Sequence, residues 1–119
     1  YMNVEELMIK TKLPLCPEET EIQKVLNIME ESSLGSAFIT SKKKLKGIIT
    51  DGDLRRFFKT NKIRNTKAKD IMTKNPKYIF KTSKAYEAFD KMLVNKISIL
   101  PVIDSEGVVG AIQLYNINY

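Results

Sequence analysis

The chain has 119 residues, 43% of them hydrophobic, which is enough for the core of one small domain or of two half-domains. It carries 20 basic and 14 acidic side chains but no histidine, the commonest general base and transition-metal ligand. The net charge of +6 fits a phosphorylated small molecule, nucleic acid or membrane headgroups as partner, and equally fits simple solubility. No apolar run approaches the roughly 20 residues of a membrane-spanning helix.

The compartment follows from the start of the chain and its cysteine content. The first six residues are acidic and lack the apolar core of a signal peptide. Cys16 is the single cysteine and has no partner for an internal disulfide. We therefore expect a cytoplasmic protein.

The first half predicts a short turn at residues 4–8 and then an extended segment entered at Pro14. Thr20 is the predicted N-cap of a helix, with Gln23 completing a capping box. The helix has an apolar face at helical spacing, formed by Ile22, Val25, Leu26 and Met29. Two predicted strands follow, at residues 36–40 and 45–50, and the basic turn at 42–44 joins them. A closing helix is predicted at residues 51–59.

The second half repeats this layout. Gly47 and Gly110 align at an offset of 63 residues, and the same offset places Thr20 on Ser83 and Met29 on Met92. Ser83 is accordingly the second predicted N-cap. The remaining elements of this half are a turn at 68–72, strands at 98–103 and 108–114, a hairpin turn at 104–107 and a helix from Tyr115.

Two copies of a unit of about 60 residues predict an α/β (α+β) fold of two β-α-β-β-α repeats, residues 1–63 and 64–119. One copy alone would expose the apolar face of its sheet, so we expect the two to pack as a pseudo-two-fold pair. Such a pair has two related clefts, each near a strand-to-helix junction, and clefts of this kind bind small molecules.

The first of these junctions, from Gly47 to Arg56, carries the candidate site. Thr50 and Asp53 lie where a strand runs into a helix, and a helix start binds phosphate while a carboxylate accepts hydrogen bonds from a sugar diol. Arg55 and Arg56 follow and can meet phosphate oxygens, although a solvated helix face explains them equally well. The Thr-x-x-Asp spacing is also that of a capping box.

These motifs together resemble the CBS domain pair over essentially the whole chain. The resemblance is carried by the Gly-apolar-apolar-Thr-x-x-Asp junction and by residues 69–76, 99–104 and 107–110. Residues 50–56 and 13–15 further resemble the C-terminal half of the arabinose-5-phosphate isomerases, which supply a precursor of Kdo for lipopolysaccharide and capsule. Nothing in the chain resembles their isomerase domain, so we expect a non-catalytic fragment.

The resemblance implies a site. Asp53 holds a nucleotide ribose and Thr50 meets ribose or phosphate, with Asp51 and Arg55 beside them. In the second repeat Gln113 and Asn116 replace Thr and Asp, so we expect one competent cleft and one weakened cleft. The residues expected to pack on the base are Leu13, Leu15 and Ala37.

The predicted function is a regulatory module that binds AMP, ADP, ATP or a CMP-sugar and modulates an attached sugar isomerase domain. We expect a homodimer and no metal, membrane or nucleic-acid partner. The alternative is a structural dimerisation module without a ligand. Catalysis is disfavoured because Asp51 and Asp53 diverge at a helix start and no base–nucleophile pair is apparent.

Overall fold

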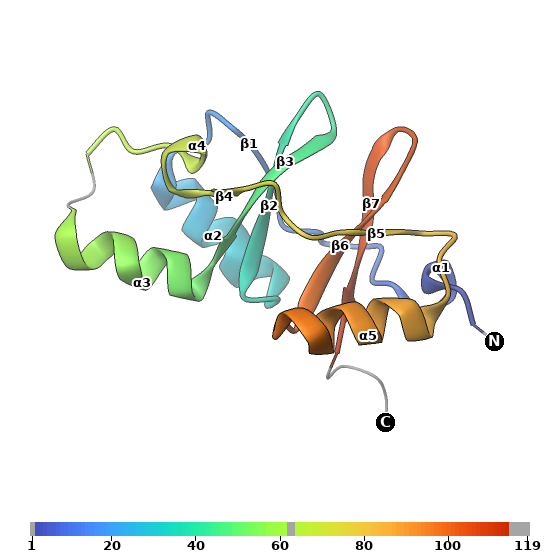
Figure 1. The fold of residues 1–119 in the computed structure, drawn as a ribbon. Coiled ribbons are helices and arrows are strands. Elements are labelled where there is room, and N and C mark those ends of the chain that lie inside the picture. Colours follow the sequence, from blue (N-terminus) through green and yellow to red (C-terminus); the bar gives the residue numbers. More distant parts are fainter. Residues whose placement is uncertain (1, 62–63, 115–119) are drawn as a thin grey trace. The chain divides into compact units, whose positions relative to one another are not determined.

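The computed structural model describes residues 2–61 and 64–114, a mixed α+β fold with two small sheets (Figure 1). The chain divides into two compact units. We call residues 14–76 the inner unit and residues 1–13 with 77–119 the outer unit. No helix within the described ranges is long and apolar enough to cross a membrane.

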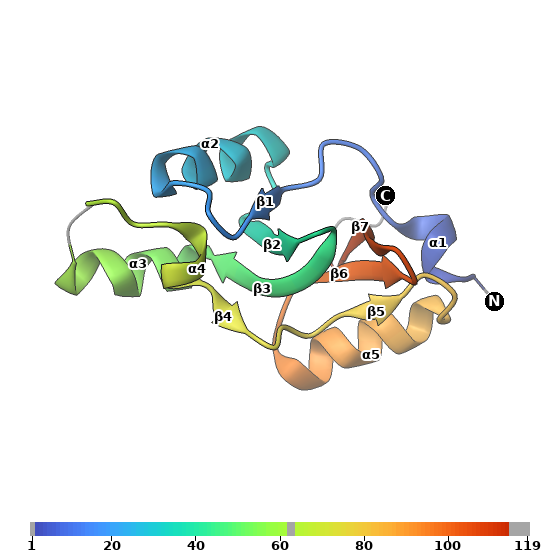
Figure 2. The same cartoon turned by 90° about the horizontal axis from the view of Figure 1, so that it is seen from above.

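The inner unit contains a four-stranded sheet in the order β1-β2-β3-β4, which Figure 2 shows side by side. β1 runs parallel to β2, while β3 is antiparallel to both β2 and β4. The helices α2 and α3 supply Val25, Met29 and Leu54 to its buried core, together with Ile39 and Ile49 of the sheet. The inner elements are β1 (Leu15–Pro17), α2 (Ile22–Ser32), β2 (Ser36–Ser41), β3 (Lys44–Thr50), α3 (Asp51–Thr60), α4 (Ala68–Ile71) and β4 (Thr73–Lys74).

The outer unit has a three-stranded sheet in the order β5-β6-β7, which repeats the pairing of β1, β2 and β3 in the inner unit. β5 runs parallel to β6, and β6 is antiparallel to β7. Its core contains Val4, Met92, Leu100, Val102 and Ile112. The outer elements are α1 (Val4–Leu7), β5 (Ile79–Phe80), α5 (Ala85–Asn95), β6 (Ile99–Asp104) and β7 (Gly107–Gln113). The helix predicted from Tyr115 lies outside the described residues.

The short opening helix of each sequence repeat belongs to the compact unit of the other repeat. α1, at the start of the first repeat, packs on α5 and β7, whereas α4, at the start of the second repeat, packs on β3 and α3. The predicted division at residues 63 and 64 therefore describes the sequence repeat, while each compact unit is assembled from segments of both repeats.

Two glycines make room for these exchanged segments. A Cβ on Gly47 would lie 2.5 Å from Met72 Sδ and 2.9 Å from the Thr73 carbonyl oxygen. A Cβ on Gly110 would lie 2.6 Å from Met8 Sδ and 2.9 Å from the carbonyl oxygen of the next residue. Each methionine directly follows its opening helix, so the glycines that the repeat alignment brought together serve the same packing contact.

The two predicted caps at Thr20 and Ser83 are wrong. α2 has Glu21 as its N-cap and α5 has Lys84, and neither helix has a cap hydrogen bond from that side chain. The exchanged segments explain the shift, because the Ile22 N–H donates to the Thr66 carbonyl at 3.0 Å. Backbone pairing with the incoming segment thus satisfies a helix-start donor that a threonine side chain was expected to satisfy.

The predicted basic turn is confirmed as a hairpin between β2 and β3. Lys42 and Lys43 are exposed and have φ angles of 50° and 70°. Positive φ at both central residues is typical of the type I′ turn, whose twist matches that of the flanking strands. Solvation of the turn therefore accounts for the tightest run of positive charge in the chain.

Candidate functional site

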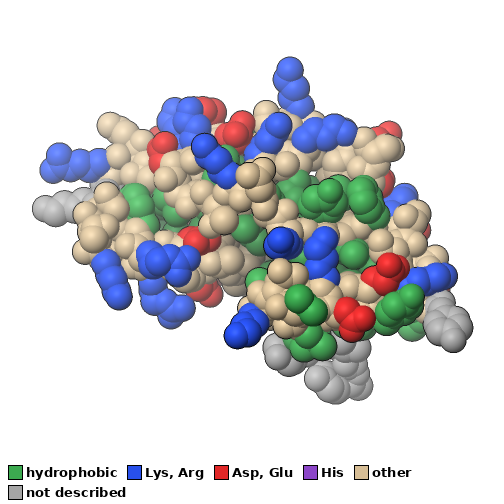
Figure 3. Space-filling model, viewed as in Figure 1, with side chains coloured by type: hydrophobic (Ala, Val, Ile, Leu, Met, Phe, Trp, Pro, Cys, Tyr) green, Lys and Arg blue, Asp and Glu red, His purple; other side chains and the backbone are tan. Residues whose placement is uncertain are grey.

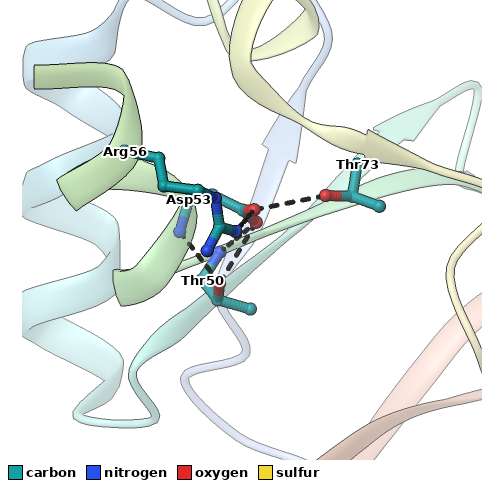
Figure 4. Close-up of polar contacts among 4 residues, drawn as sticks. All are labelled: Thr50, Asp53, Arg56 and Thr73. Carbon is teal, nitrogen blue, oxygen red and sulfur yellow. Dashed lines mark hydrogen bonds and ion pairs between the residues drawn. The ribbon is translucent and has the colours of Figure 1, made fainter. Parts of the chain in front are cut away.

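The strand-to-helix junction of the inner unit forms a complete capping box (Figure 4). Thr50 ends β3 and caps α3, and its Oγ1 accepts a hydrogen bond from the Asp53 N–H at 3.2 Å. Asp53 Oδ2 in turn accepts hydrogen bonds from the Thr50 N–H at 2.9 Å and from the Thr50 hydroxyl at 3.1 Å. The capping interpretation of this motif is therefore confirmed. A role in binding would use the same carboxylate.

The other oxygen of Asp53, Oδ1, accepts hydrogen bonds from two further side chains. Arg56 Nη2 lies 2.6 Å from it and Thr73 Oγ1 lies 3.3 Å from it. The Asp53 side chain is 11% exposed, whereas that of Arg56 is 72% exposed. The cap thus holds Oδ2 of the carboxylate, while a solvated arginine and a threonine hold Oδ1.

These two partners differ in how far the sequence reveals them. Arg56 follows Asp53 by three residues on a helix, a spacing that brings side chains together. Thr73 belongs to the second repeat and reaches Asp53 because β4 pairs with β3, with Thr73 opposite Ile48. Sequence reasoning anticipated Arg56 as a phosphate contact but missed Thr73, since no local pattern signals that strand pairing.

Asp51 and Arg55, the other charged residues of the predicted site, line a different feature. With Phe58 and Lys59 they border a hollow of about 510 Å³ along α3. An adjoining hollow of about 420 Å³ lies between α2 and α3 and is lined by Leu26, Met29, Glu30, Ser33, Gly35, Asp51 and Leu54. The structure therefore places Asp51 and Arg55 at these hollows, while the Asp53 carboxylate contacts Thr50, Arg56 and Thr73.

The three residues predicted to pack on a base occupy different surroundings. Leu15 lies on β1 and is 37% exposed. Ala37 lies on β2 and is fully buried. Leu13 belongs to the outer unit. Their role as base contacts stays a prediction.

The corresponding junction of the outer unit lacks the hydroxyl and the carboxylate. Gln113 ends β7 at the position of Thr50, and Asn116, the counterpart of Asp53, lies outside the described residues. Ile9 pairs with Ala111 as Thr73 pairs with Ile48, so an aliphatic side chain replaces the hydroxyl that reaches Asp53. Among the described residues the two junctions therefore differ at two positions: Gln113 replaces Thr50, and Ile9 replaces Thr73.

Charged side chains elsewhere serve structure. Glu19 contacts Lys67 Nζ at 2.8 Å and Lys69 Nζ at 2.6 Å, and these hydrogen bonds lower its pKa to about 2. Burial raises the pKa of the Cys16 thiol to about 11, so this cysteine is a core residue and a poor nucleophile.

The face drawn in Figure 3 has lysines and arginines scattered among acidic side chains over both units.

The part of the chain that the structure describes contains no group of three or more acidic, cysteine or histidine side chains placed to hold a metal ion. The group at the junction that can bind a ligand is the Asp53 carboxylate, next to the start of α3. Such a carboxylate accepts hydrogen bonds from hydroxyls, and the helix start favours anions.

The two repeats, each with a strand-to-helix junction, define a class of protein, a tandem module built from two related α+β halves. The chain belongs to the CBS domain family, whose profile matches residues 4–60 and 68–117. The family match covers both repeats, so the chain is a CBS pair.

Relatives and solved structures agree with this assignment. The chain is 31% identical over 119 residues to the arabinose 5-phosphate isomerase KdsD of Francisella tularensis, covering 98% of the chain and 36% of that protein. It matches CBSX2 in complex with AMP at a TM-score of 0.82 and 20% identity, covering 95% of this chain and 90% of that one.

A further solved structure is the CBS domain pair of protein MJ0100 in complex with 5-methylthioadenosine and S-adenosyl-L-methionine. It matches at a TM-score of 0.82 and 23% identity, over 95% of this chain and 90% of that one. The chain spans about a third of the length of the curated relatives it matches. At these identities the solved structures establish the fold.

Proposed function

We propose that this CBS pair binds a nucleotide, either an adenine nucleotide or a cytidine-linked sugar, at Asp53 and thereby modulates an attached sugar-phosphate isomerase domain. The observation that carries the proposal is the Asp53 carboxylate, which the capping box fixes at the start of α3 with its Oδ1 directed to side chains outside the cap. A ribose diol donates to such an oxygen, and a phosphate is favoured at the adjoining helix start.

The comparisons support this proposal through the chemistry that the named ligands share. AMP, 5-methylthioadenosine and S-adenosyl-L-methionine all contain adenine on a ribose ring with its diol, although their remaining groups differ in charge. The KdsD relative supports the attached isomerase domain, because the chain aligns with about a third of that protein. Regulation requires that the ligand bind two states of the whole protein with different affinity.

The test is a thermal-shift and calorimetric screen of the 119-residue chain with AMP, ADP, ATP and a CMP-linked sugar. A ligand that binds the folded state raises the melting temperature by mass action. In Asp53→Ala we expect binding at least about tenfold weaker, since a hydrogen bond to a charged group contributes about 1.5–3 kcal/mol.

Asp70→Ala is the matched control for this experiment. Asp70 is the equivalent carboxylate at the start of α4 in the same unit, where its Oδ2 accepts the Lys67 N–H at 2.9 Å. Its removal likewise opens a capping box in the same unit, at a carboxylate that does not contact Asp53. Loss of binding in both variants, or no binding of any nucleotide by the unmodified chain, would contradict the proposal.

A second candidate function, homodimerisation without a ligand, is favoured by the hollows along α2 and α3. The hollow along α3 is lined by Leu54 and the 38% exposed Phe58, and side chains of both charge signs border the two hollows, with Glu30 and Asp51 against Arg55 and Lys59. A surface that carries both signs can pair with itself across a two-fold axis. If this face is the dimer contact and the pair has no ligand, Phe58→Glu yields a monomer in light scattering, and neither the unmodified chain nor the variant shows a thermal shift with any nucleotide.

A further inference from the structure

The hydrogen bonds of Asp53 leave no free acceptor position on its carboxylate. Two carboxylate oxygens offer about four lone-pair positions. Thr50 fills two on Oδ2 with its N–H and its hydroxyl, and Arg56 and Thr73 fill two on Oδ1. A ligand hydroxyl that donates to Asp53 must therefore displace one of the existing partners.

The partners differ in how readily they leave. The Thr50 bonds form the cap of α3, so displacing them would expose helix-start donors. The Arg56 side chain is 72% exposed and pairs with Asp53 across three residues of one helix. An ion pair with one solvated partner contributes little to stability. Arg56 is therefore the charged partner that a ligand can displace without opening the cap, and Oδ1 is the oxygen that becomes available.

A displaced Arg56 would remain beside the start of α3. A Cβ built on Gly52, in the first turn of that helix, would lie 3.5 Å from Arg56 Nη1, so the guanidinium already lies over this turn. A phosphate bound at the helix start would be close to it and would replace the lost carboxylate as its counter-ion. A neutral nucleoside offers no such replacement.

We propose that Arg56 is a specificity residue that occupies Asp53 Oδ1 in the free protein and moves to the ligand's phosphate when a ribose hydroxyl takes its place. The inference rests on the proposed nucleotide site at Asp53. It follows that Arg56 opposes the binding of neutral nucleosides and favours that of nucleotides. The same side chain thus acts against one ligand class and for the other.

Arg55 provides the matched comparison within the same helix. It carries the same charge one position earlier but lines the hollow with Phe58 and Lys59 rather than contacting Asp53. Arg55→Ala and Arg56→Ala therefore remove the same charge from α3, and only Arg56→Ala frees Asp53 Oδ1. A general effect of net charge on nucleotide binding would appear in both variants.

The experiment measures, by titration calorimetry on the 119-residue chain, the dissociation constants of adenosine, AMP, cytidine and CMP for the unmodified protein and both variants. In Arg56→Ala we expect the nucleoside to bind about two- to fivefold more tightly, the range that an exposed ion pair represents. The preference for nucleotide over nucleoside should fall about tenfold or more, as for a lost charged hydrogen bond. In Arg55→Ala both quantities should stay within about twofold.

The outcomes separate this inference from the proposed function. If the unmodified chain binds nucleotide through Asp53 but the two arginine variants behave alike, the proposed function stands and the role of Arg56 is overturned. If the unmodified chain binds no nucleotide while Arg56→Ala binds a nucleoside, the proposed function and the contribution of Arg56 to phosphate binding are both overturned. If neither protein binds any of the four compounds, both proposals are overturned.

Discussion

The inner and outer units share their packing but not their polar junctions. In both, a β-hairpin has its register shift at the equivalent place, Ile39/Thr40 in one and Val102/Ile103 in the other. Both also use a glycine to accommodate a methionine from the other repeat. The inner unit has a capping box formed by Thr50 and Asp53, whereas the outer unit has Gln113 at the position of Thr50. Duplication has kept the residues that the scaffold requires, while the groups that can bind a ligand differ.

The comparison predicts its largest effect in the two cores. Met92 is fully buried in the outer unit, and its repeat partner Met29 is 6% exposed and borders a hollow in the inner unit. Truncation to Ala should destabilise either unit by about 2–5 kcal/mol. The loss should be larger for Met92→Ala, because more contacts are lost there. Urea unfolding measures both, with the exposed Met2→Ala as control.

A larger loss of stability for Met29→Ala would contradict this prediction, since it would mean that the inner core depends more strongly on its less buried methionine. Separate unfolding transitions for the two units would allow a more direct test. Each variant would then shift only the transition of the unit that contains it.

The next effect concerns the paired glycines. Gly47→Ala and Gly110→Ala each introduce a Cβ that lies 2.9 Å from a backbone carbonyl oxygen, which cannot rotate away as a methionine side chain can. We expect similar losses of about 1–3 kcal/mol for the two variants, the usual cost of overpacking. Thermal unfolding measures them.

Gly52→Ala is the control for the glycine pair. A Cβ there meets nothing nearer than the Arg56 guanidinium at 3.5 Å, so Ala should be neutral or stabilise the helix. If Gly47→Ala were harmless while Gly110→Ala was costly, the exchanged segments would not be held in the same way.

The residues explain how much of this structure the sequence could predict. Local periodicity located the helix face at Ile22 to Met29, the repeat offset located its counterpart at Met92, and the Thr50–Asp53 spacing correctly predicted a capping box. These features depend on residues within a few positions of one another, which a single sequence displays directly.

The features that the sequence did not predict all depend on distant backbone pairing. The helix starts at Ile22 and Ala85 are set by carbonyls of Thr66 and Met2, which belong to the exchanged segments. Thr73 and Asp53 are twenty residues apart in sequence, and their contact requires β4 to pair with β3. No local propensity encodes such partners, so the periodic pattern placed the helices and misassigned their caps.

The smallest predicted effect comes from the ion pairs that tie the exchanged segments down, which have opposite polarity in the two units. In the inner unit Glu19 lies between Lys67 and Lys69, whereas in the outer unit Lys81 lies between Glu5 at 3.7 Å and Asp104 at 3.6 Å. These side chains are solvated, so their contribution is small and weakens in salt.

The pH dependence of the Glu19 cluster tests this polarity. The lysines lower the pKa of Glu19 from 4.5 to about 2, so its contribution is complete above about pH 4.5 and is lost as pH falls toward 2. Glu19→Gln should therefore lower the melting temperature slightly at pH 7, and the difference from the unmodified chain should vanish near pH 2 or in 1 M salt. Glu31→Gln, at an exposed carboxylate in the same unit, should show no such convergence. A gap that widened on acidification would mean that the Glu19 pairs do not hold the exchanged segment, and that backbone pairing alone does so.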